Sequence, residues 1–147
     1  MPIQISLSNA IGALQGLAGG GPGPGPGPTP PLDTYTGAAA AYSVRLLRTA
    51  YTGVPIRVRR DTAGGTGDDD MADISFDSGI ISLDSAISNA SAGVTATTLG
   101  QFLNVGTVNG TTYTDPDSLI ATASWYVSKM YDQTGNGRDA TAAATKQ

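Results

Sequence analysis

The stretch AAAAYSVRLLRTAYTGVPIRVRR, residues Ala38–Arg60, decides the fold that we expect. Its first half, Ala38–Ala50, is rich in Ala and Leu and lacks Pro and Gly, which favours a helix. Gly53 and Pro55 end that pattern. Apolar and basic residues then alternate in Ile56–Arg59, with the period of a half-buried strand. The stretch therefore predicts a helix, a tight turn and a strand. Apolar residues recur in its first half at helical spacing, namely Ala39, Ala40, Tyr42, Val44, Leu46, Leu47, Ala50 and Tyr51.

Four residues of this unit are core candidates, namely Tyr42, Leu46, Ile56 and Val58. Arg45 and Arg48 fall three apart on the other side of the expected helix. Two interpretations of the basic residues remain open. They form the solvated face of a packing unit, which a charge-alternating strand favours because it is typical of a sheet with one wet face. Alternatively, they form a dedicated anion or ligand site.

Composition excludes several classes of chemistry. The chain has 147 residues, no Cys, no His and no Glu, so all twelve acidic residues are Asp. It therefore lacks disulfides, thiolate chemistry, the usual general base and the commonest metal ligand. The net charge of −4 argues against a nucleic-acid partner. No apolar run approaches the about 20 residues that span a bilayer, so we expect no membrane insertion. No basic region precedes an apolar stretch at the N-terminus, so we expect no signal peptide.

Three segments divide the chain. Residues 1–18 are an apolar peptide. Gly19–Pro31, GGGPGPGPGPTPP, is a linker in which alternating Pro favours a semi-extended spacer. Residues 32–147 are expected to form a β-rich domain that is truncated at its C-terminus, because a strand pattern begins at Ala140 and no later segment is left to pair with it. We therefore expect the natural protein to continue.

The apolar peptide is interpreted as a docking element. A short helix capped by Ser8 or Asn9 is expected to be marginal alone in water and to order on a partner or to self-associate. The alternative is a frayed terminus, but large apolar residues in a free tail would be a liability. The docking candidates are Ile3, Ile5, Leu7, Ile11, Leu14 and Leu17.

The acidic loop Asp61–Asp73, DTAGGTGDDDMAD, does not match a phosphate-binding pattern. Its clustered carboxylates are ligands of the kind that Ca²⁺ prefers, but they do not fit the EF-hand spacing. A solvated hairpin turn is the favoured interpretation, and we expect no cofactor. The candidate calcium ligands are Asp68, Asp69, Asp70 and Asp73.

Weaker patterns predict the remaining elements. Strands are expected at residues 74–76, 111–114 and 120–131, with turns at residues 77–79 and at Asn109-Gly110. A weak helix is expected from Asp84 or Ser85 to about Asn89, and another over Thr98–Val105. Trp125 is interpreted as a core anchor rather than a platform for a sugar. The fold class is thus mainly β with one N-terminal helix.

The closing motif KMYDQTGNGRDAT, Lys129–Thr141, predicts an ordered loop between strands. Asp and Asn at turn positions accept local backbone hydrogen bonds, and Gly permits positive φ. We expect its side chains to satisfy backbone groups, with Arg138 paired to a nearby Asp. The motif residues are Tyr131, Asp132, Gln133, Thr134, Gly135, Asn136, Gly137, Arg138 and Asp139.

Five segments in order resemble the N-terminal part of the arabinofuranosidase B catalytic-domain family, in the form found in bacteriophage virion proteins. They are Ala39–Arg48 (AAAYSVRLLR), Tyr51–Arg60 (YTGVPIRVRR), Asp73–Phe76 (DISF), Leu83-Asp84-Ser85 and Tyr131–Thr141 (YDQTGNGRDAT). The resemblance covers about residues 33–143, with Thr134 where the family usually has Ser. It implies a β-sandwich and, in the fungal enzymes, arabinofuranose removal by a Glu nucleophile and an Asp acid beyond the motif.

Glycoside hydrolysis normally needs two carboxylates that flank the bond. Asp132 and Asp139 are the two with a motif context, and both are better interpreted as residues that fasten the loop. We therefore carry over no catalytic residue.

Three functions follow as hypotheses. The first is a non-enzymatic virion structural protein, in a tail fibre, appendage or head decoration, whose partners are other virion proteins. It is expected to form a homo-oligomer, with a trimer as one candidate. The second is a module that binds a host-surface glycan. The third is a glycoside hydrolase or depolymerase, which the absence of Glu disfavours.

Overall fold

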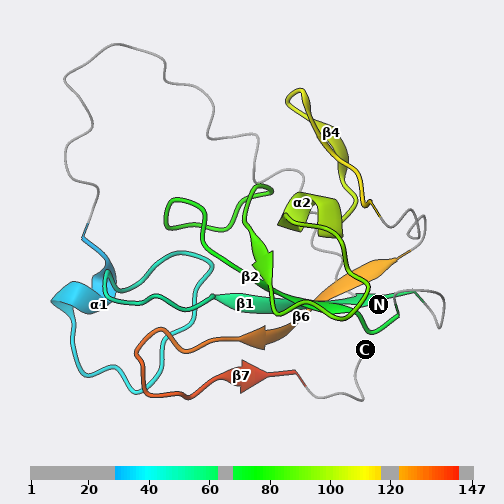
Figure 1. Cartoon of the computed structure of the whole chain (residues 1–147). Helices are drawn as coiled ribbons and strands as arrows, with labels where there is room; N and C mark the ends of the chain where they lie inside the picture. The colour runs from blue at the N-terminus through cyan, green and yellow to red at the C-terminus, as the bar shows by residue number, and fades with distance from the viewer. Residues whose placement is uncertain (1–28, 63–67, 117–122, 143–147) are drawn as a thin grey trace, which may run out of the picture.

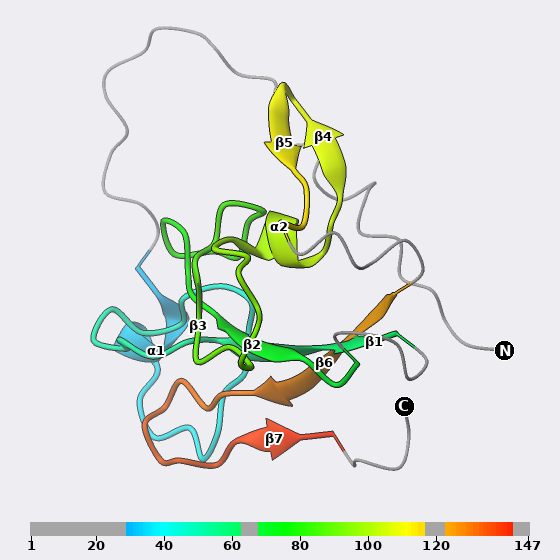
Figure 2. The ribbon, with the colours of Figure 1, turned by 45° about the vertical axis from the view of Figure 1, so that its right-hand side comes forward.

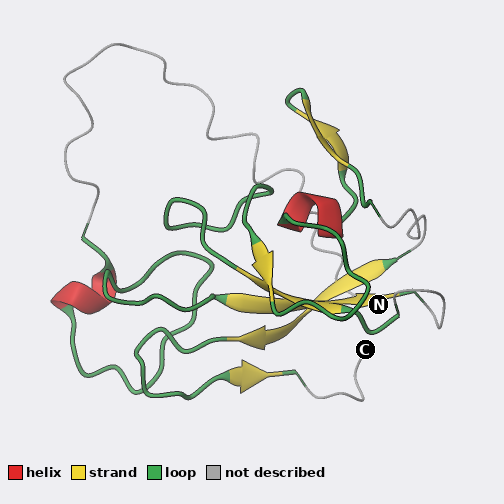
Figure 3. Cartoon of the chain, viewed as in Figure 1, coloured by secondary structure: helices red, strands yellow, loops and turns green. Residues whose placement is uncertain are grey.

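The computed structural model describes residues 29–62, 68–116 and 123–142. These residues form a mainly β protein with two helices of one turn each (Figure 1, Figure 3). The helices are α1 (Pro31–Thr34) and α2 (Leu99–Phe102). The strands are β1 (Ile56–Asp61), β2 (Met71–Ile74), β3 (Ile87–Ser88), β4 (Gly106–Val108), β5 (Thr111–Tyr113), β6 (Ser124–Met130) and β7 (Ala140–Thr141).

Five strands form one antiparallel sheet in the order β3-β2-β1-β6-β7. The central strand β1 is the strand that the alternation at Ile56–Arg59 predicts, and that prediction is confirmed: its even-numbered residues are buried and its odd-numbered residues are partly exposed. Its pairing with β6 shifts register between Arg57 and Val58, which marks a β-bulge in the ladder.

The core lies on one face of this sheet. Ile56, Val58 and Ile74 of the sheet pack with Leu99 and Phe102 of α2, which lies over the sheet in both ribbon views (Figure 1, Figure 2). Trp125 packs against this cluster, and its Nε1–H donates to the carbonyl of Phe102 at 3.1 Å. The interpretation of Trp125 as a core anchor is therefore confirmed.

The second sheet is the hairpin β4–β5, which projects away from the five-stranded sheet (Figure 2). Asn109 and Gly110 form its turn with φ of 49° and 82°, which is the positive-φ pair that an Asn-Gly turn requires. At its base, Thr98 caps α2 by accepting the N–H of Gln101, so the expected short helix after Thr98 is present as one turn.

The predicted helix over Ala38–Ala50 is wrong. This segment is an extended loop whose backbone groups bond to other parts of the chain. Leu46 N–H, for example, donates to the Gly79 carbonyl, and Ile81 N–H donates to the Val44 carbonyl. These tertiary bonds satisfy the backbone without a helix, and they outweigh the small energetic preference of Ala and Leu for helix. Of the four core candidates, Ile56 and Val58 are buried, whereas Leu46 is half-buried and Tyr42 is exposed.

Two smaller predictions are also corrected. The weak helix expected from Asp84 to Asn89 is absent, and β3 occupies part of that range. The strand expected at Ala140 does find a partner, since β7 pairs with β6 through Met130↔Ala140 and Lys129↔Thr141. Among the described residues, no helix combines the length and apolar character needed to cross a membrane. The docking candidates Ile3–Leu17 and most of the linker lie outside the described residues.

Candidate functional site

The motif loop, residues 131–139, is joined to the loop of residues 38–48 by many hydrogen bonds. Asp132 is buried at its centre. Its Oδ1 accepts the N–H of Ala41 at 3.0 Å and the N–H of Thr134 at 2.9 Å, and its Oδ2 accepts the N–H of Arg138 at 3.2 Å. The Thr134 hydroxyl also donates to this carboxylate at 2.7 Å. The Asp132 side chain therefore shapes its own loop and fixes a distant one.

These donors determine the charge state of Asp132. Burial alone would raise the pKa of its carboxyl group, but the bonds from Thr134, Ala41 and Arg138 outweigh burial and hold the pKa well below its usual range. A carboxylate with this low a pKa stays ionised and has its lone pairs occupied. It is therefore poorly suited to act as a general acid.

Gln133 is fully buried and fixes the same distant loop through its amide. Its Oε1 accepts the N–H of Leu47 at 2.8 Å, and its Nε2 donates to the carbonyls of Ser43 and Arg45 at 2.8 and 3.0 Å. Its own N–H donates to the Ala41 carbonyl at 2.9 Å. A single residue thus satisfies four backbone groups of a segment that has no secondary structure of its own.

Asp139 supports Asp132 rather than opposing it across a cleft. Its Oδ1 accepts the N–H of Asp132 at 2.9 Å, and its Oδ2 pairs with Lys129 at 2.8 Å. The bond from Lys129 and the bond from the Asp132 N–H lower the pKa of Asp139. We expected Arg138 to pair with a nearby Asp, but the ion pair of Asp139 is made by Lys129 instead. Arg138 forms hydrogen bonds through its backbone N–H and carbonyl.

The first residue of the motif reaches a second anchor on the sheet. Tyr131 donates its hydroxyl to Oδ1 of buried Asp73 at 2.7 Å, and Arg57 makes a two-pronged ion pair with the same carboxylate at 2.7 and 2.9 Å. Asn89 adds a bond at 2.9 Å. Burial opposes ionisation of Asp73, but these three donors lower its pKa overall. Burial first, and then the bond to Asp73, raises the pKa of Tyr131 to about 12.

The four candidate calcium ligands each bond to a different partner. Asp69 pairs with Arg59, Asp70 pairs with Arg60 at 2.6 Å, and Asp73 belongs to the anchor just described. Asp68 accepts the N–H of Thr62 at 2.9 Å. In the described parts of the chain, no three His, Cys, Asp or Glu side chains are grouped so that they could hold a metal ion.

A third network lies inside the protein. Arg60 is 1% exposed and pairs with Asp115 at 2.7 Å as well as with Asp70, while its guanidinium lies 5.0 Å from the centre of the Phe102 ring. This network joins β1 to the segment that follows the hairpin. Sequence reasoning did not find it, since Arg60 and Asp115 are 55 residues apart and share no local pattern.

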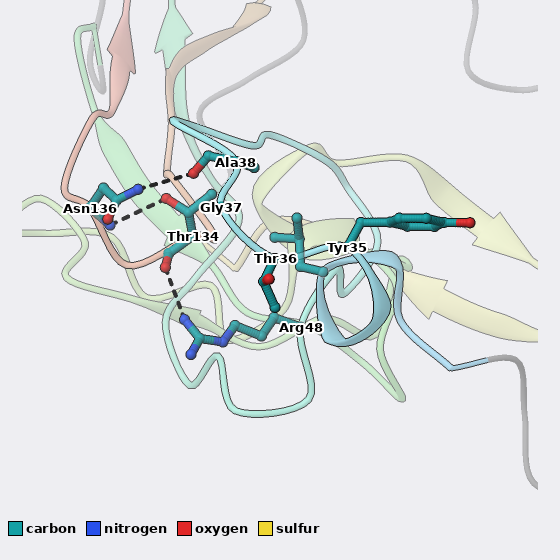
Figure 4. A pocket seen from close by; sticks show the side chains of 8 residues that line it. Tyr35, Thr36, Gly37, Ala38, Arg48, Thr134 and Asn136 are labelled. Carbon is teal, nitrogen blue, oxygen red and sulfur yellow. Dashed lines mark hydrogen bonds between the residues drawn. The ribbon is translucent and has the colours of Figure 1, made fainter.

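A shallow pocket of about 180 Å³ lies where the motif loop meets α1, at the end of the Gly-Pro linker. Its lining residues are Leu32, Tyr35, Thr36, Gly37, Ala38, Arg48, Thr134 and Asn136 (Figure 4). Neither Asp132 nor Asp139 belongs to the lining, so the two motif carboxylates do not face this pocket.

No family model, no curated protein and no solved structure matches this chain. The resemblance to the arabinofuranosidase B family therefore stays a prediction, and the function has to be argued from the geometry above.

Proposed function

We propose that the chain is a non-catalytic structural protein of a bacteriophage virion, in which residues 1–18 dock the β-rich domain to the particle. The proposal that the protein is non-catalytic rests on how the side chains of the motif loop are hydrogen-bonded. The Asp132 carboxylate, the Asp139 carboxylate and the Gln133 amide are all occupied by internal hydrogen bonds that build the fold. A pair of carboxylates that performs glycoside hydrolysis must instead flank a substrate.

The virion setting rests on different support. The motif sequences resemble those of phage virion proteins, and an apolar peptide followed by a Pro-stiffened spacer suits a domain held away from a scaffold. In the same proposal, the five-stranded sheet is one layer of a β-sandwich. Tyr126 and Val127 of β6 are 40% and 49% exposed and lie on opposite faces of the strand, so each face keeps some apolar surface that a further layer or a second copy can cover.

The experiment locates the chain in particles and tests the docking peptide. Antibodies to the full chain should label purified virions of the phage that carries the gene. The variant Ile3→Ser/Leu7→Ser/Leu14→Ser should be lost from the particles, because it removes apolar surface from the docking peptide. The matched variant Ile3→Met/Leu7→Met/Leu14→Met keeps that surface and should be incorporated normally.

Both variants should give the same circular-dichroism spectrum as the original chain, which shows that the domain is intact. Normal incorporation of the serine variant would refute docking by residues 1–18. Virions that contain none of the chain would refute the structural role itself.

A further inference from the structure

We propose that the pocket beside Arg48 binds the carboxylate-bearing unit of an acidic saccharide, such as a uronic acid. This inference goes beyond the proposed function, since it needs only the purified chain and holds whether or not residues 1–18 dock to a particle. It also chooses the ligand-site interpretation of Arg48 over the solvated-face interpretation.

One hydrogen bond orients the exposed guanidinium of Arg48 and leaves part of its hydrogen-bonding capacity unused. Its Nη1 donates to the Thr134 carbonyl at 2.9 Å, and Thr134 is itself bonded to Asp132. Figure 4 shows Arg48 reaching from below toward Thr134 at the side of the pocket. Its Nε and Nη2 have no partner among the described residues. A guanidinium with a free edge matches a carboxylate in two-pronged geometry, and prior fixation reduces the entropy lost on binding.

No carboxylate of the described chain competes for that free edge. None of the eight lining residues is acidic. The carboxylate of Asp33, close in sequence to the pocket, is taken up by the N–H and hydroxyl of Thr49. Because the whole chain carries a net charge of −4, long-range attraction does not draw anions to it. Recognition of a carboxylate therefore has to come from contact with Arg48.

The rest of the lining suits a sugar ring rather than a bare anion. The Thr36 hydroxyl and the Asn136 Oδ1 have no hydrogen-bond partner among the described residues, and neither do the N–H groups of Thr36, Gly37 and Ala38. Asn136 is oriented by its Nδ2, which donates to the carbonyls of Ala38 and Ala39 at 3.1 Å. These groups offer donors and an acceptor for ring hydroxyls, and Leu32 adds apolar surface for the ring carbons.

Size and openness limit the ligand to one unit at a time. A volume of about 180 Å³ is below the roughly 300–1,000 Å³ of pockets that hold drug-sized ligands. Tyr35 is 76% exposed, and its ring points away from Arg48 in Figure 4, so it does not close the pocket.

The test titrates galacturonate, galactose and acetate into the isotopically labelled full chain and follows backbone amide and Arg Nε signals by NMR. We expect galacturonate to shift the signals of Gly37, Ala38 and Arg48 with millimolar affinity. Galactose and acetate should each bind at least about tenfold more weakly, because each lacks one half of the recognised chemistry.

Arg48→Gln should weaken galacturonate binding by about tenfold or more, while Arg45→Gln should leave it unchanged. Arg45→Gln is the matched control because it removes the same charge from the same loop, outside the pocket lining. The spectra of both variants report directly on whether the fold is intact. If Arg48→Gln disturbs the spectrum, Arg48→Lys provides the second readout, since it keeps the charge, lacks the two-pronged edge and should bind more weakly.

Three results would overturn the proposal. One is the absence of galacturonate-dependent shifts at these residues. The second is equal binding by the original chain and an intact Arg48→Gln variant. The third is binding of galactose or acetate that is as tight as the binding of galacturonate. Such a result would show that the carboxylate, or the sugar ring, is not recognised. None of these results bears on incorporation into virions, so failure here is distinguishable from failure of the proposed function.

Discussion

Asp132 Oδ1 accepts the backbone N–H of Ala41 at 3.0 Å, across 91 positions of sequence. The same carboxylate also orders its own turn through Thr134 and Arg138. Local turn chemistry and tertiary structure are therefore joined at one side chain, and variants of Asp132 should reveal how much the loop of residues 38–48 depends on it.

Asp132→Asn is expected to lower the free energy of unfolding by about 2 kcal/mol, because a neutral amide accepts fewer and weaker hydrogen bonds from these donors. Urea denaturation followed by fluorescence measures the change. The matched variant is Asp69→Asn, which removes an equal charge at a largely exposed carboxylate and keeps a residue type that tolerates the φ of 61° there. That control should cost at most about 0.5 kcal/mol. Equal losses in the two variants would contradict the central role of Asp132.

Gln133→Ala should release the loop of residues 38–48 locally and destabilise the protein by about 3 kcal/mol, since three side-chain hydrogen bonds to backbone groups are lost. Hydrogen exchange at the Leu47 amide is the direct readout, and its protection should fall most. Gln101→Ala, which removes two exposed bonds to Thr97, is the control and should leave Leu47 protected. Unchanged exchange at Leu47 in Gln133→Ala would show that the loop is held by other contacts.

Acid should destabilise the fold. The pKa values of Asp132, Asp73 and Asp139 are all lowered in the folded protein. A lowered folded-state pKa contributes stability above the unfolded-state value of about 4, and that contribution is lost as pH falls through and below it. The free energy of unfolding should therefore decline below about pH 4, and the decline should be shallower in Asp132→Asn.

The chain has no His and no Cys, so stability should change little between about pH 5 and pH 8. Urea denaturation at a series of pH values measures the whole profile. A loss of stability centred on neutral pH would show that other groups control it.

Alkali should act through Tyr131, whose pKa is raised to about 12 by burial and by its bond to Asp73. A raised folded-state pKa gives stability that is complete below the unfolded-state value of about 10 and is lost as pH rises toward 12. The pKa values of Tyr51 and Tyr113 are also raised, so the prediction concerns the component of the tyrosinate absorbance titration near pH 12, which Tyr131→Phe should remove. Tyr35→Phe, on an exposed ring that does not contact Asp73, should leave that component in place. A component near pH 12 that survives in Tyr131→Phe would assign it to another tyrosine.

Arg60→Met should destabilise the protein by about 3 kcal/mol or more, because it leaves the buried Asp115 carboxylate without its guanidinium. Thermal unfolding gives the comparison with Arg45→Met, an exposed substitution expected to change stability by less than about 0.5 kcal/mol. A small effect of Arg60→Met would mean that packing of the methionine against Phe102 compensates for the lost ion pair.

Sequence patterns correctly predicted the elements that residues close in sequence stabilise. The alternation at Ile56–Arg59 predicted a strand, the segment Thr98–Val105 predicted a short helix, which is present as one turn, and Asn109-Gly110 predicted the turn of a hairpin. The helix over Ala38–Ala50 failed for the opposite reason. Its partners are Asp132, Gln133 and Gly79, and nothing within the segment indicates that they will bond its backbone.

The candidate site could be predicted only in part. Composition of the motif indicated a hydrogen-bonded loop, but not which segment it would hold. The Asp73–Arg57 pair had a detectable signal, because two strands joined by a glycine-rich acidic loop place these residues opposite each other in an antiparallel register. The pocket beside Arg48 had none, since it exists only once two segments 86 residues apart are brought together.

The dependence of the loop of residues 38–48 on the motif loop has a consequence for synthesis. The ribosome delivers Ala41 well before Asp132, and the interval is about 5 to 18 s for 91 residues at 5–20 residues per second. During that interval the nascent segment has leucines and unpaired amides but not the residues that cover them. Its exposure to chaperones and proteases therefore ends only when the motif loop, residues 131–139, has emerged.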